Sequence, residues 1–334
     1  MLAASIRFGI ALQGDKTPAE YVAHAQLIDR YPFAVVSVYN DLFFQPALGP
    51  LLLMAPHVRS AQLGPAALNP YLVHPIEIAG QIALLDIMSE GRAYLGLARG
   101  SWLDAVGVAQ PRPINTLREA VQVITRLLSG ASEPFVGQVF QLSAGSTLRY
   151  RVQRGCVPIT IGTWGKRTAR LAGEIADEVK IGGSANPAMA NLLRPFIAEG
   201  EQAAGRSPNS VGICLGAVTV VDPDRGRARA LARREVALYA PVVAPLDPTL
   251  SDADWLSRIA EPVRLGDVAT VASLIPDNAL DLLAFAGTPT DVTRQVEDLA
   301  RAGVARVEFG TPHGLYPLDG IRLLGERVLP SFSS

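Results

Sequence analysis

Eight short apolar runs, each followed by a stretch with helical spacing, are the feature that most restricts the fold of this chain. Runs that are apolar throughout are typical of strands in a parallel sheet that helices cover. Eight strand–helix units predict an α/β fold, a (β/α)8 TIM barrel. The predicted strands are Ile6–Leu12, Ala34–Tyr39, Ser60–Ala67, Ala93–Ala98, Val157–Gly162, Glu178–Gly183, Val211–Val221 and Arg306–Thr311.

Helical stretches separate these runs, and two longer segments interrupt the alternation. The predicted helices are Thr17–Arg30, Pro46–Leu53, Pro75–Met88, Ile114–Leu128, Lys166–Ala176, Pro187–Ala204, Asp224–Tyr239, Pro289–Ala302 and Gly320–Val328. Residues 130–155 have the glycines and the alternation of a β-hairpin, whereas residues 240–280 are proline-rich and irregular. Loops this long are uncommon inside a domain unless they cover a site. We therefore expect one barrel domain over residues 1–334, with insertions near 130–155 and 240–280.

A doubly wound parallel sheet is the alternative to the barrel. That fold usually has fewer strands, and it has a G-x-G-x-x-G turn after the first strand. Here the first predicted strand runs into LQGDKTP, which does not contain that turn. The barrel is therefore the preferred prediction.

Charge and composition narrow the classes of partner. The formal net charge is −1 and acids and bases are interspersed, so nothing indicates nucleic acid or an anionic membrane surface, and we expect a small-molecule partner. The N-terminal segment MLAASIRFGIAL lacks a basic leader and is interrupted by Arg7, so it fits neither a signal peptide nor a membrane-spanning helix. Two cysteines, Cys156 and Cys214, favour a reducing compartment, which we take to be the cytoplasm.

The turns after the predicted strands are the place to look for chemistry, because a barrel carries its active site at the carboxyl ends of its strands. The turn IGTWGKRT, from Ile161 to Thr168, joins a strand to a helix, so its free N–H groups and Lys166 could hold a phosphate. It is not a Walker loop, since Thr160 and Arg167 stand where that motif needs Gly and Ser or Thr. An ordinary glycine-rich turn is the alternative.

Metal chemistry finds no support in the sequence, whereas one carboxylate stands at a strand end. The four histidines include no pair with the spacing of metal ligands, so no metal site is predicted. Asp41 directly follows the second predicted strand and is a candidate acid or proton relay. A structural turn carboxylate is an equally weighted alternative for Asp41.

Four segments together resemble a known family. They are LGPAALNPYLVHP from Leu63, LDIMSEGRAYLGLARGSW from Leu85, IGTWGKRTARLAGEIADEVKIGGSANP from Ile161, and FAGTPTDVTRQVEDLARAGVARVEFGTPHG from Phe285. They are similar to the bacterial-luciferase-like flavin and deazaflavin oxidoreductases. Within that superfamily they most resemble the branch of methylenetetrahydromethanopterin reductase, which uses coenzyme F420. The resemblance covers nearly the whole chain and implies a (β/α)8 barrel with insertions and a homodimer or higher homo-oligomer.

The resemblance also implies where the cofactor lies. The family's anchor for the phosphate and side chain matches Gly162, Thr163, Trp164, Gly165 and Lys166, together with Gly182 and Gly183. The ring is expected over the barrel mouth, in a position bounded by Asn40, Gly64, Pro65, Ala66, Ala67, Asn69, Arg99, Gly100 and Ser101. Family members have a cis peptide bond without proline in a bulge after the third strand, which corresponds here to Ala66–Ala67.

The implied activity is hydride transfer between C5 of the deazaflavin and a small organic substrate, with Asp41 and Asn40 as candidate catalytic residues. Relatives usually have an Asp–His pair where this chain has Asn40–Asp41, and an acidic residue where the first strand has Ala11. We therefore expect a substrate other than methanopterin, beneath a roof of Trp102, the 130–155 segment and Phe285–Pro289. The alternatives are an FMN-dependent monooxygenase and a non-catalytic protein that binds a flavin or deazaflavin.

Overall fold

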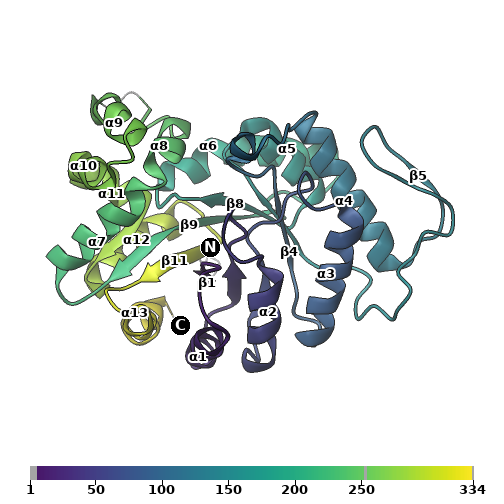
Figure 1. Ribbon diagram of the computed structural model, residues 1–334, viewed down its shortest axis with the longest axis horizontal. Helices are drawn as coiled ribbons and strands as arrows, with labels where there is room; N and C mark the ends of the chain where they lie inside the picture. The colour runs from purple at the N-terminus through teal and green to yellow at the C-terminus, as the bar shows by residue number, and fades with distance from the viewer. Residues whose placement is uncertain (1–5, 252–253, 333–334) are drawn as a thin grey trace.

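Parallel strands surrounded by helices form the body of the molecule (Figure 1). The computed structural model describes residues 6–251 and 254–332. The strands of the main sheet are β1 (Arg7–Leu12), β2 (Val35–Val38), β3 (Gln62–Pro65), β4 (Leu95–Ala98), β7 (Ile159–Gly162), β8 (Glu178–Gly182), β9 (Gly212–Val221), β10 (Ala284–Gly287) and β11 (Arg306–His313).

The sheet closes into the predicted barrel. Its order is β3-β2-β1-β11-β9-β8-β7-β4, and the paired strands run parallel. The two end strands meet through bridges from Leu63 to Ala93 and from Leu68 to Leu97. These eight strands correspond to the eight predicted from the sequence, so the (β/α)8 fold is confirmed.

Several helices begin at a residue whose side chain caps them. Thr17 and Glu20 form a capping box at α1, and Thr288 and Asp291 form another at α12. The helices are α1 (Pro18–Ile28), α2 (Leu48–Met54), α3 (Pro75–Met88), α4 (Pro113–Ser129), α5 (Lys166–Ile175), α6 (Pro187–Ala203), α7 (Arg225–Ala237), α8 (Ala240–Val243), α9 (Asp254–Arg264), α10 (Val268–Leu274), α11 (Asp277–Leu283), α12 (Pro289–Arg301) and α13 (Pro317–Leu323). Short turns of helix are η1 (Ala55–His57), η2 (Leu103–Val106), η3 (Ala244–Leu246), η4 (Leu324–Val328) and η5 (Leu329–Phe332).

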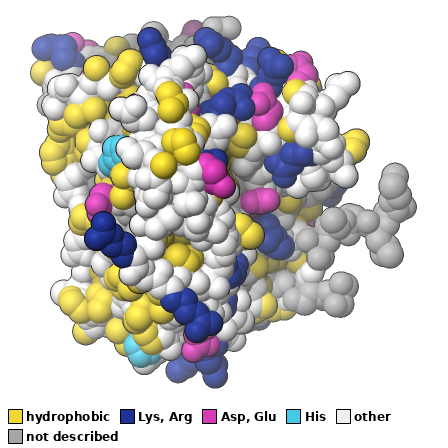
Figure 2. Space-filling model, turned by 90° about the vertical axis from the view of Figure 1, so that its right-hand side faces the viewer, with side chains coloured by type: hydrophobic (Ala, Val, Ile, Leu, Met, Phe, Trp, Pro, Cys, Tyr) yellow, Lys and Arg dark blue, Asp and Glu magenta, His cyan; other side chains and the backbone are white. Residues whose placement is uncertain are grey.

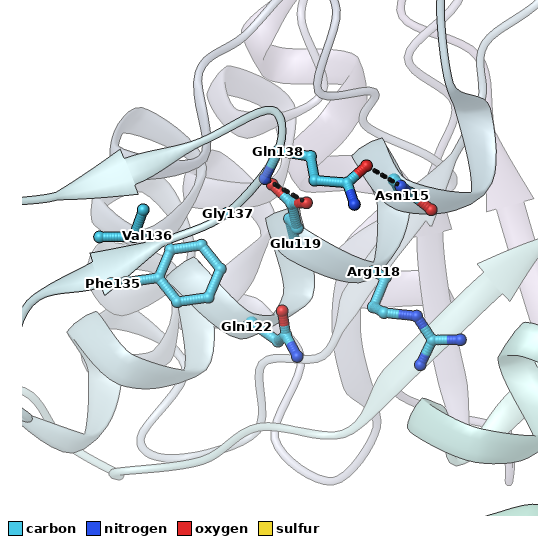
Figure 3. A pocket seen from close by; sticks show the side chains of 8 residues that line it. All are labelled: Asn115, Arg118, Glu119, Gln122, Phe135, Val136, Gly137 and Gln138. Atoms are coloured by element: carbon cyan, nitrogen blue, oxygen red, sulfur yellow. Dashed lines mark hydrogen bonds between the residues drawn. The ribbon is translucent and has the colours of Figure 1, made fainter.

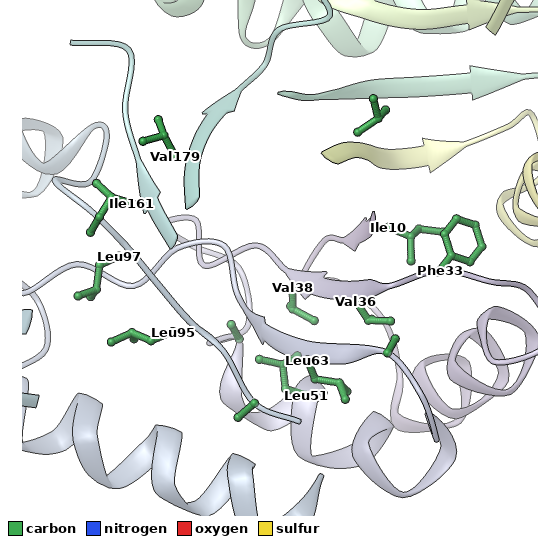
Figure 4. Packing of buried hydrophobic residues seen from close by; sticks show 14 of the residues in the cluster. Ile10, Phe33, Val36, Val38, Leu51, Leu63, Leu95, Leu97, Ile161 and Val179 are labelled. Carbon is green, nitrogen blue, oxygen red and sulfur yellow. The ribbon is translucent and has the colours of Figure 1, made fainter. Parts of the chain in front are cut away.

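The main apolar core lies between the strands and the surrounding helices. Alternate residues of a strand face opposite sides, so Val36 and Val38 of β2 share one side and Ser37 takes the other. Figure 4 shows Leu51 of α2 beside Leu63 of β3, and both are buried. The apolar side chains of the strands therefore point outward to the helices, and the barrel interior is left to the alternate positions.

Two sequence-based expectations need correction. Residues 240–280 are not irregular, because they form α8, η3, α9, α10 and most of α11, which pack with α7 around a second apolar cluster that includes Trp255 and Leu280. A ninth strand, β10, also pairs with the C-terminal half of β9, from Val218 to Val221. We missed β10 because its sequence, AFAG, is short and contains no β-branched residue.

The 130–155 segment forms the predicted hairpin, but it lies outside the helices. Its strands β5 (Phe135–Val136) and β6 (Gln141–Leu142) pair antiparallel, and the hairpin lies beyond α4 at the right of Figure 1. The Glu119 carboxylate of α4 accepts hydrogen bonds from the backbone N–H groups of Gln138, Val139 and Phe140 at 2.8–2.9 Å. The expectation that this segment roofs the barrel mouth was therefore wrong, because Glu119 holds it on α4.

A hollow of about 450 Å³ separates the hairpin from α4. Figure 3 shows Glu119 reaching the backbone at Gln138, and Asn115 donating to the Gln138 side chain at 2.8 Å. The hollow is lined by Asn115, Arg118, Glu119, Gln122 and residues 135–138. None of the predicted site residues lines it.

Candidate functional site

The barrel mouth, by which we mean the end where the strands' carboxyl termini lie, gathers the turns that sequence reasoning selected. Neighbouring strands are in register there, with Val38 opposite Pro65, Ala98 opposite Gly162, and Gly162 opposite Lys180. The predicted residues after β2, β3, β4, β7 and β8 therefore form one continuous arc around the mouth.

The segment after β3 is a bulge with a cis Ala66–Ala67 peptide bond, as predicted. The N–H of Ala66 donates to the carbonyl of Val38 at 2.8 Å, and the N–H of Leu68 donates to that of Gly96 at 3.0 Å. A Cβ at Gly96 would lie 2.0 Å from the Pro65 carbonyl, so the bulge fits only against a glycine. Ala66 and Ala67 are partly exposed, whereas Leu68 is buried, which leaves the cis bond accessible.

Asn69 ties this bulge to the turn after β4. Its Oδ1 atom accepts hydrogen bonds from the N–H groups of Tyr71 and Leu72, at 3.2 and 3.0 Å. Gly100 has φ +88°, and a Cβ there would lie 3.1 Å from the Asn69 side chain. Arg99 and Ser101 on either side are exposed. Asn69 therefore shapes the mouth, because its carbonyl oxygen is already occupied by its own turn.

The turn between β7 and α5 leaves donors free for an anion. Gly165 is the N-cap of α5 and offers no side-chain cap to the first N–H groups, unlike Thr17 at α1. Trp164 is pinned by its indole N–H, which donates to the Gly182 carbonyl at 2.8 Å. Nothing lies within 4 Å of a Cβ built at Gly182. This open backbone, with the exposed Lys166, has the chemistry of a phosphate site.

Asp41 and Asn40 come from the turn after β2 and have different surroundings. The Asn40 side-chain oxygen accepts a hydrogen bond from the N–H of Ala47 at 3.0 Å, which is a structural role. The Asp41 carboxylate accepts one from the Gln13 side chain at 3.0 Å. Sequence reasoning missed Gln13, although it directly follows β1. Asp41 is partly exposed at the mouth, where a ligand can reach it.

Aromatic side chains stand beside Asp41. Trp102 is 40% exposed, and its ring lies 6.5 Å from that of Tyr239, which follows α7. The pKa of Tyr239 is raised by burial and by Asp41, and a hydrogen bond with Gln13 offsets part of the rise. Trp102 thus borders the mouth as expected. Phe285 does not, because it is fully buried against Phe309.

The barrel interior below the mouth holds a buried ion cluster that sequence reasoning also missed. Glu308 pairs with Lys180 and accepts hydrogen bonds from Arg306 at 2.7 Å and from Ser37 at 2.6 Å. Arg306 also pairs with Glu178, at 2.6 Å. Apolar branched side chains usually fill a barrel of this kind. Here two acids and two bases, Glu178, Glu308, Lys180 and Arg306, replace them.

The cluster fixes the charge of Glu308. Burial alone would raise the pKa of this carboxyl group, but Lys180 and Arg306 outweigh burial and lower it to about 2. Glu308 is therefore ionised at neutral pH, and its charge is matched by Lys180 and Arg306.

The described part of the chain, residues 6–251 and 254–332, contains no group of three or more His, Cys, Asp or Glu residues placed to hold a metal ion. No described helix is long and apolar enough to span a membrane.

Comparisons with known proteins agree on one family. The family model for luciferase-like monooxygenases matches residues 1–306. The 5,10-methylenetetrahydromethanopterin reductase of Archaeoglobus fulgidus is 30% identical over 97% of this chain and 99% of its own length. The F420-dependent glucose-6-phosphate dehydrogenase of Kineococcus radiotolerans is 28% identical over 90% of each chain. The solved F420-dependent tetrahydromethanopterin reductase of Methanopyrus kandleri superposes with a TM-score of 0.91 at 27% identity, covering 99% of this chain and all of its own.

Proposed function

Because this chain belongs to the luciferase-like monooxygenase family, we propose that it is a coenzyme F420-dependent oxidoreductase that transfers a hydride to or from a small organic substrate. The observation that carries the proposal is the full-length similarity to F420-dependent reductases, at 30% identity, together with a mouth whose turns fit such a cofactor. When bound, the deazaflavin supplies two-electron hydride chemistry at C5.

The chain's own residues would hold the cofactor and orient it toward the substrate. The open N–H groups of α5 and the exposed Lys166 would bind the phosphate, beside Gly182 and Gly183. The small side chains of Ala66 and Ala67 and the turn at Arg99–Ser101 would bound the ring. The side of the mouth with Asp41 and Trp102 is then left for the substrate. Such a site accelerates hydride transfer by holding the hydride donor and the acceptor carbon of the substrate in contact and correctly oriented.

The substrate is proposed to differ from methanopterin. The family resemblance implies acid and base groups at the positions where this chain has Asn40–Asp41 and Ala11. An FMN-dependent monooxygenase is the secondary candidate, and it is favoured only by the description of the family model.

Hydride transfer tests the enzymatic part of the proposal. Purified protein loaded with reduced coenzyme F420 is mixed with a panel of aldehydes, ketones, imines and activated alkenes, and the absorbance of the oxidised cofactor is followed. We expect reoxidation by at least one compound, faster than in protein-free cofactor. Bound cofactor that stays reduced across the whole panel would instead support the non-catalytic binding protein.

We also propose a homodimer, formed through the outer face of α3. Ile76, Leu84, Ile87 and Met88 lie on that face at helical spacing and are 40–43% exposed. Figure 2 looks onto the side of the molecule that carries α3, α4 and the hairpin, and hydrophobic side chains gather on its left and lower parts. Such a patch is typical of an interface.

Sedimentation velocity tests this interface. The wild-type protein is expected to sediment as a dimer. Leu84→Glu is expected to sediment as a monomer, because forming the contact would bury an unpaired charge. Val136→Glu, on the hairpin at the end of β5, is the control and should remain dimeric, because Val136 is 83% exposed and lies away from α3. A wild-type monomer at micromolar concentration would rule the interface out.

We place the protein in the cytoplasm. Both Cys156 and Cys214 are free thiols, which is consistent with a reducing compartment.

A further inference from the structure

Tyr39 stands between the interior ion cluster and the barrel mouth. It directly follows β2, and its N–H donates to the carbonyl of Leu12 at 2.9 Å. The ammonium group of Lys180 lies 5.2 Å from the centre of its ring. Its hydroxyl oxygen lies beside Gly310 of β11, where a Cβ would come within 2.5 Å of it. The ring of Tyr39 thus covers Lys180, and the missing side chain at Gly310 leaves room for the hydroxyl group.

The hydroxyl group of Tyr39 has no hydrogen-bond partner among residues 6–251 and 254–332, and the residue is partly exposed. By contrast, the hydroxyl groups of Tyr94 and Tyr21 form hydrogen bonds. That of Tyr94 is 2.8 Å from Ser37, and that of Tyr21 donates to the Gln13 carbonyl at 3.2 Å. The Tyr39 hydroxyl group is therefore free to donate its proton to a ligand in the mouth.

Its surroundings keep that proton on the oxygen at neutral pH. Burial raises the pKa of Tyr39 well above its ordinary value, and Glu308 and Asp41 raise it further. Tyr239 and the Cys214 thiol face it as well, and Lys180 is the cation over its ring.

No histidine is placed to do the same work. His313 at the end of β11 is buried, and burial lowers its pKa to about 3. His24 is buried on α1, His57 belongs to η1 before the start of β3, and His74 caps α3 with its Nδ1 atom. Among the described residues at the mouth, the free hydroxyl of Tyr39 is thus the better placed proton donor.

We propose that Tyr39 is a catalytic residue that donates a hydrogen bond, and then its proton, to the oxygen or nitrogen of a substrate C=O or C=N group. This inference rests on the proposed function, with the reduced deazaflavin as the hydride source. The hydride brings its electron pair to the substrate carbon, and the π electrons move to the heteroatom. The heteroatom takes the proton from the Tyr39 hydroxyl, and water returns a proton to the phenolate. The substrate class is therefore a carbonyl or imine compound, reduced to an alcohol or amine.

The first test needs no substrate. Full-length protein is labelled with 3-fluorotyrosine, and the Tyr39 fluorine resonance is identified by its loss in Tyr39→Phe. Oxidised coenzyme F420 is expected to shift this resonance at saturation. The resonance of Tyr31 should stay in place, because its hydroxyl group donates a hydrogen bond to the Glu326 carboxylate at the surface, at 2.9 Å. An unmoved Tyr39 resonance, in protein that fluorescence shows to be saturated with cofactor, would overturn the proposal.

The second test is kinetic and uses the acceptor found in the compound panel. Tyr39→Phe is expected to slow single-turnover hydride transfer about 100-fold or more, because general acid catalysis typically contributes that much. The Kd for the deazaflavin should stay within about twofold, because the hydroxyl group is proposed to contact the substrate and not the cofactor. Tyr31→Phe is the control and should match the wild type.

The two tests separate this inference from the function on which it rests. Wild-type protein that binds no deazaflavin, or reduces nothing in the panel, refutes the proposed function. An acceptor that Tyr39→Phe reduces as fast as the wild type refutes only the role of Tyr39.

Discussion

Replacing Glu308 with glutamine is expected to lower the free energy of unfolding by about 3–5 kcal/mol, the range for breaking a buried ion pair by removing one partner. Glu308 is fully buried, and it is the carboxylate that Lys180 and Arg306 share. Glutamine keeps the size of the side chain but leaves both cations without their common counter-charge. Urea unfolding at pH 7 measures the effect.

A surface ion pair provides the matched control. Glu133, which is 3.5 Å from Arg126 and has a side chain 74% exposed, is replaced in the same way. Glu133→Gln should change the unfolding free energy by less than about 1 kcal/mol, because exposed pairs contribute little. Equal effects of the two substitutions would contradict the interior cluster.

The difference between Glu308→Gln and the wild type should depend on pH. The pKa of Glu308 is about 2 in the folded chain, against an ordinary value of 4.5. A depressed carboxyl pKa stabilises the folded state above pH 4.5, and this stabilisation is lost as the pH falls from 4.5 toward 2. The gap between wild type and variant should therefore be constant near neutrality and should narrow across that acidic window.

Gly165→Val is expected to raise the Kd for coenzyme F420 at least tenfold, which corresponds to about 1.4 kcal/mol. The backbone at Gly165 has φ −95° and ψ 135°, which a β-branched residue adopts readily. A Cβ there would meet nothing closer than the Thr163 hydroxyl at 3.7 Å. The added side chain should therefore leave the fold intact and block the ligand. Titration of the cofactor fluorescence measures the Kd.

Two companion variants sharpen this result. Lys166→Ala removes the exposed cation and should weaken binding by about 1.5–3 kcal/mol, the usual contribution of a hydrogen bond to a charged group. Gly49→Val adds the same side chain on α2, where a Cβ also meets nothing within 4 Å, and should leave the Kd unchanged. If Gly165→Val and Lys166→Ala both bind as the wild type does, the phosphate does not lie at α5.

The barrel was predictable because most of its strands are largely apolar runs and several helices carry cap residues such as Thr17 and Thr288. β10 was not predictable, because Ala and Gly in a run of four residues give neither a β-branched signal nor a period. Its place is set by pairing with β9, a contact made across more than sixty residues of chain.

The phosphate turn and the interior ion cluster likewise differed in how well the sequence predicted them. The turn at Gly162–Lys166 was visible because glycines and a lysine between a strand and a helix are a local signal. Glu308 and Lys180 are single charged residues in strands 128 positions apart, and only the register of the closed barrel places both inside. Tyr239 follows the helix α7, where no rule about strand ends applies.

The proposed function requires the barrel mouth to bind a deazaflavin, and a titration of the purified protein measures this binding. Purified wild-type protein is titrated with oxidised coenzyme F420 and, separately, with FMN, and the Kd of each is taken from the cofactor fluorescence. We expect saturable binding of coenzyme F420 that is at least tenfold tighter than that of FMN. Tighter binding of FMN, or protein that purifies with FMN bound, would contradict it.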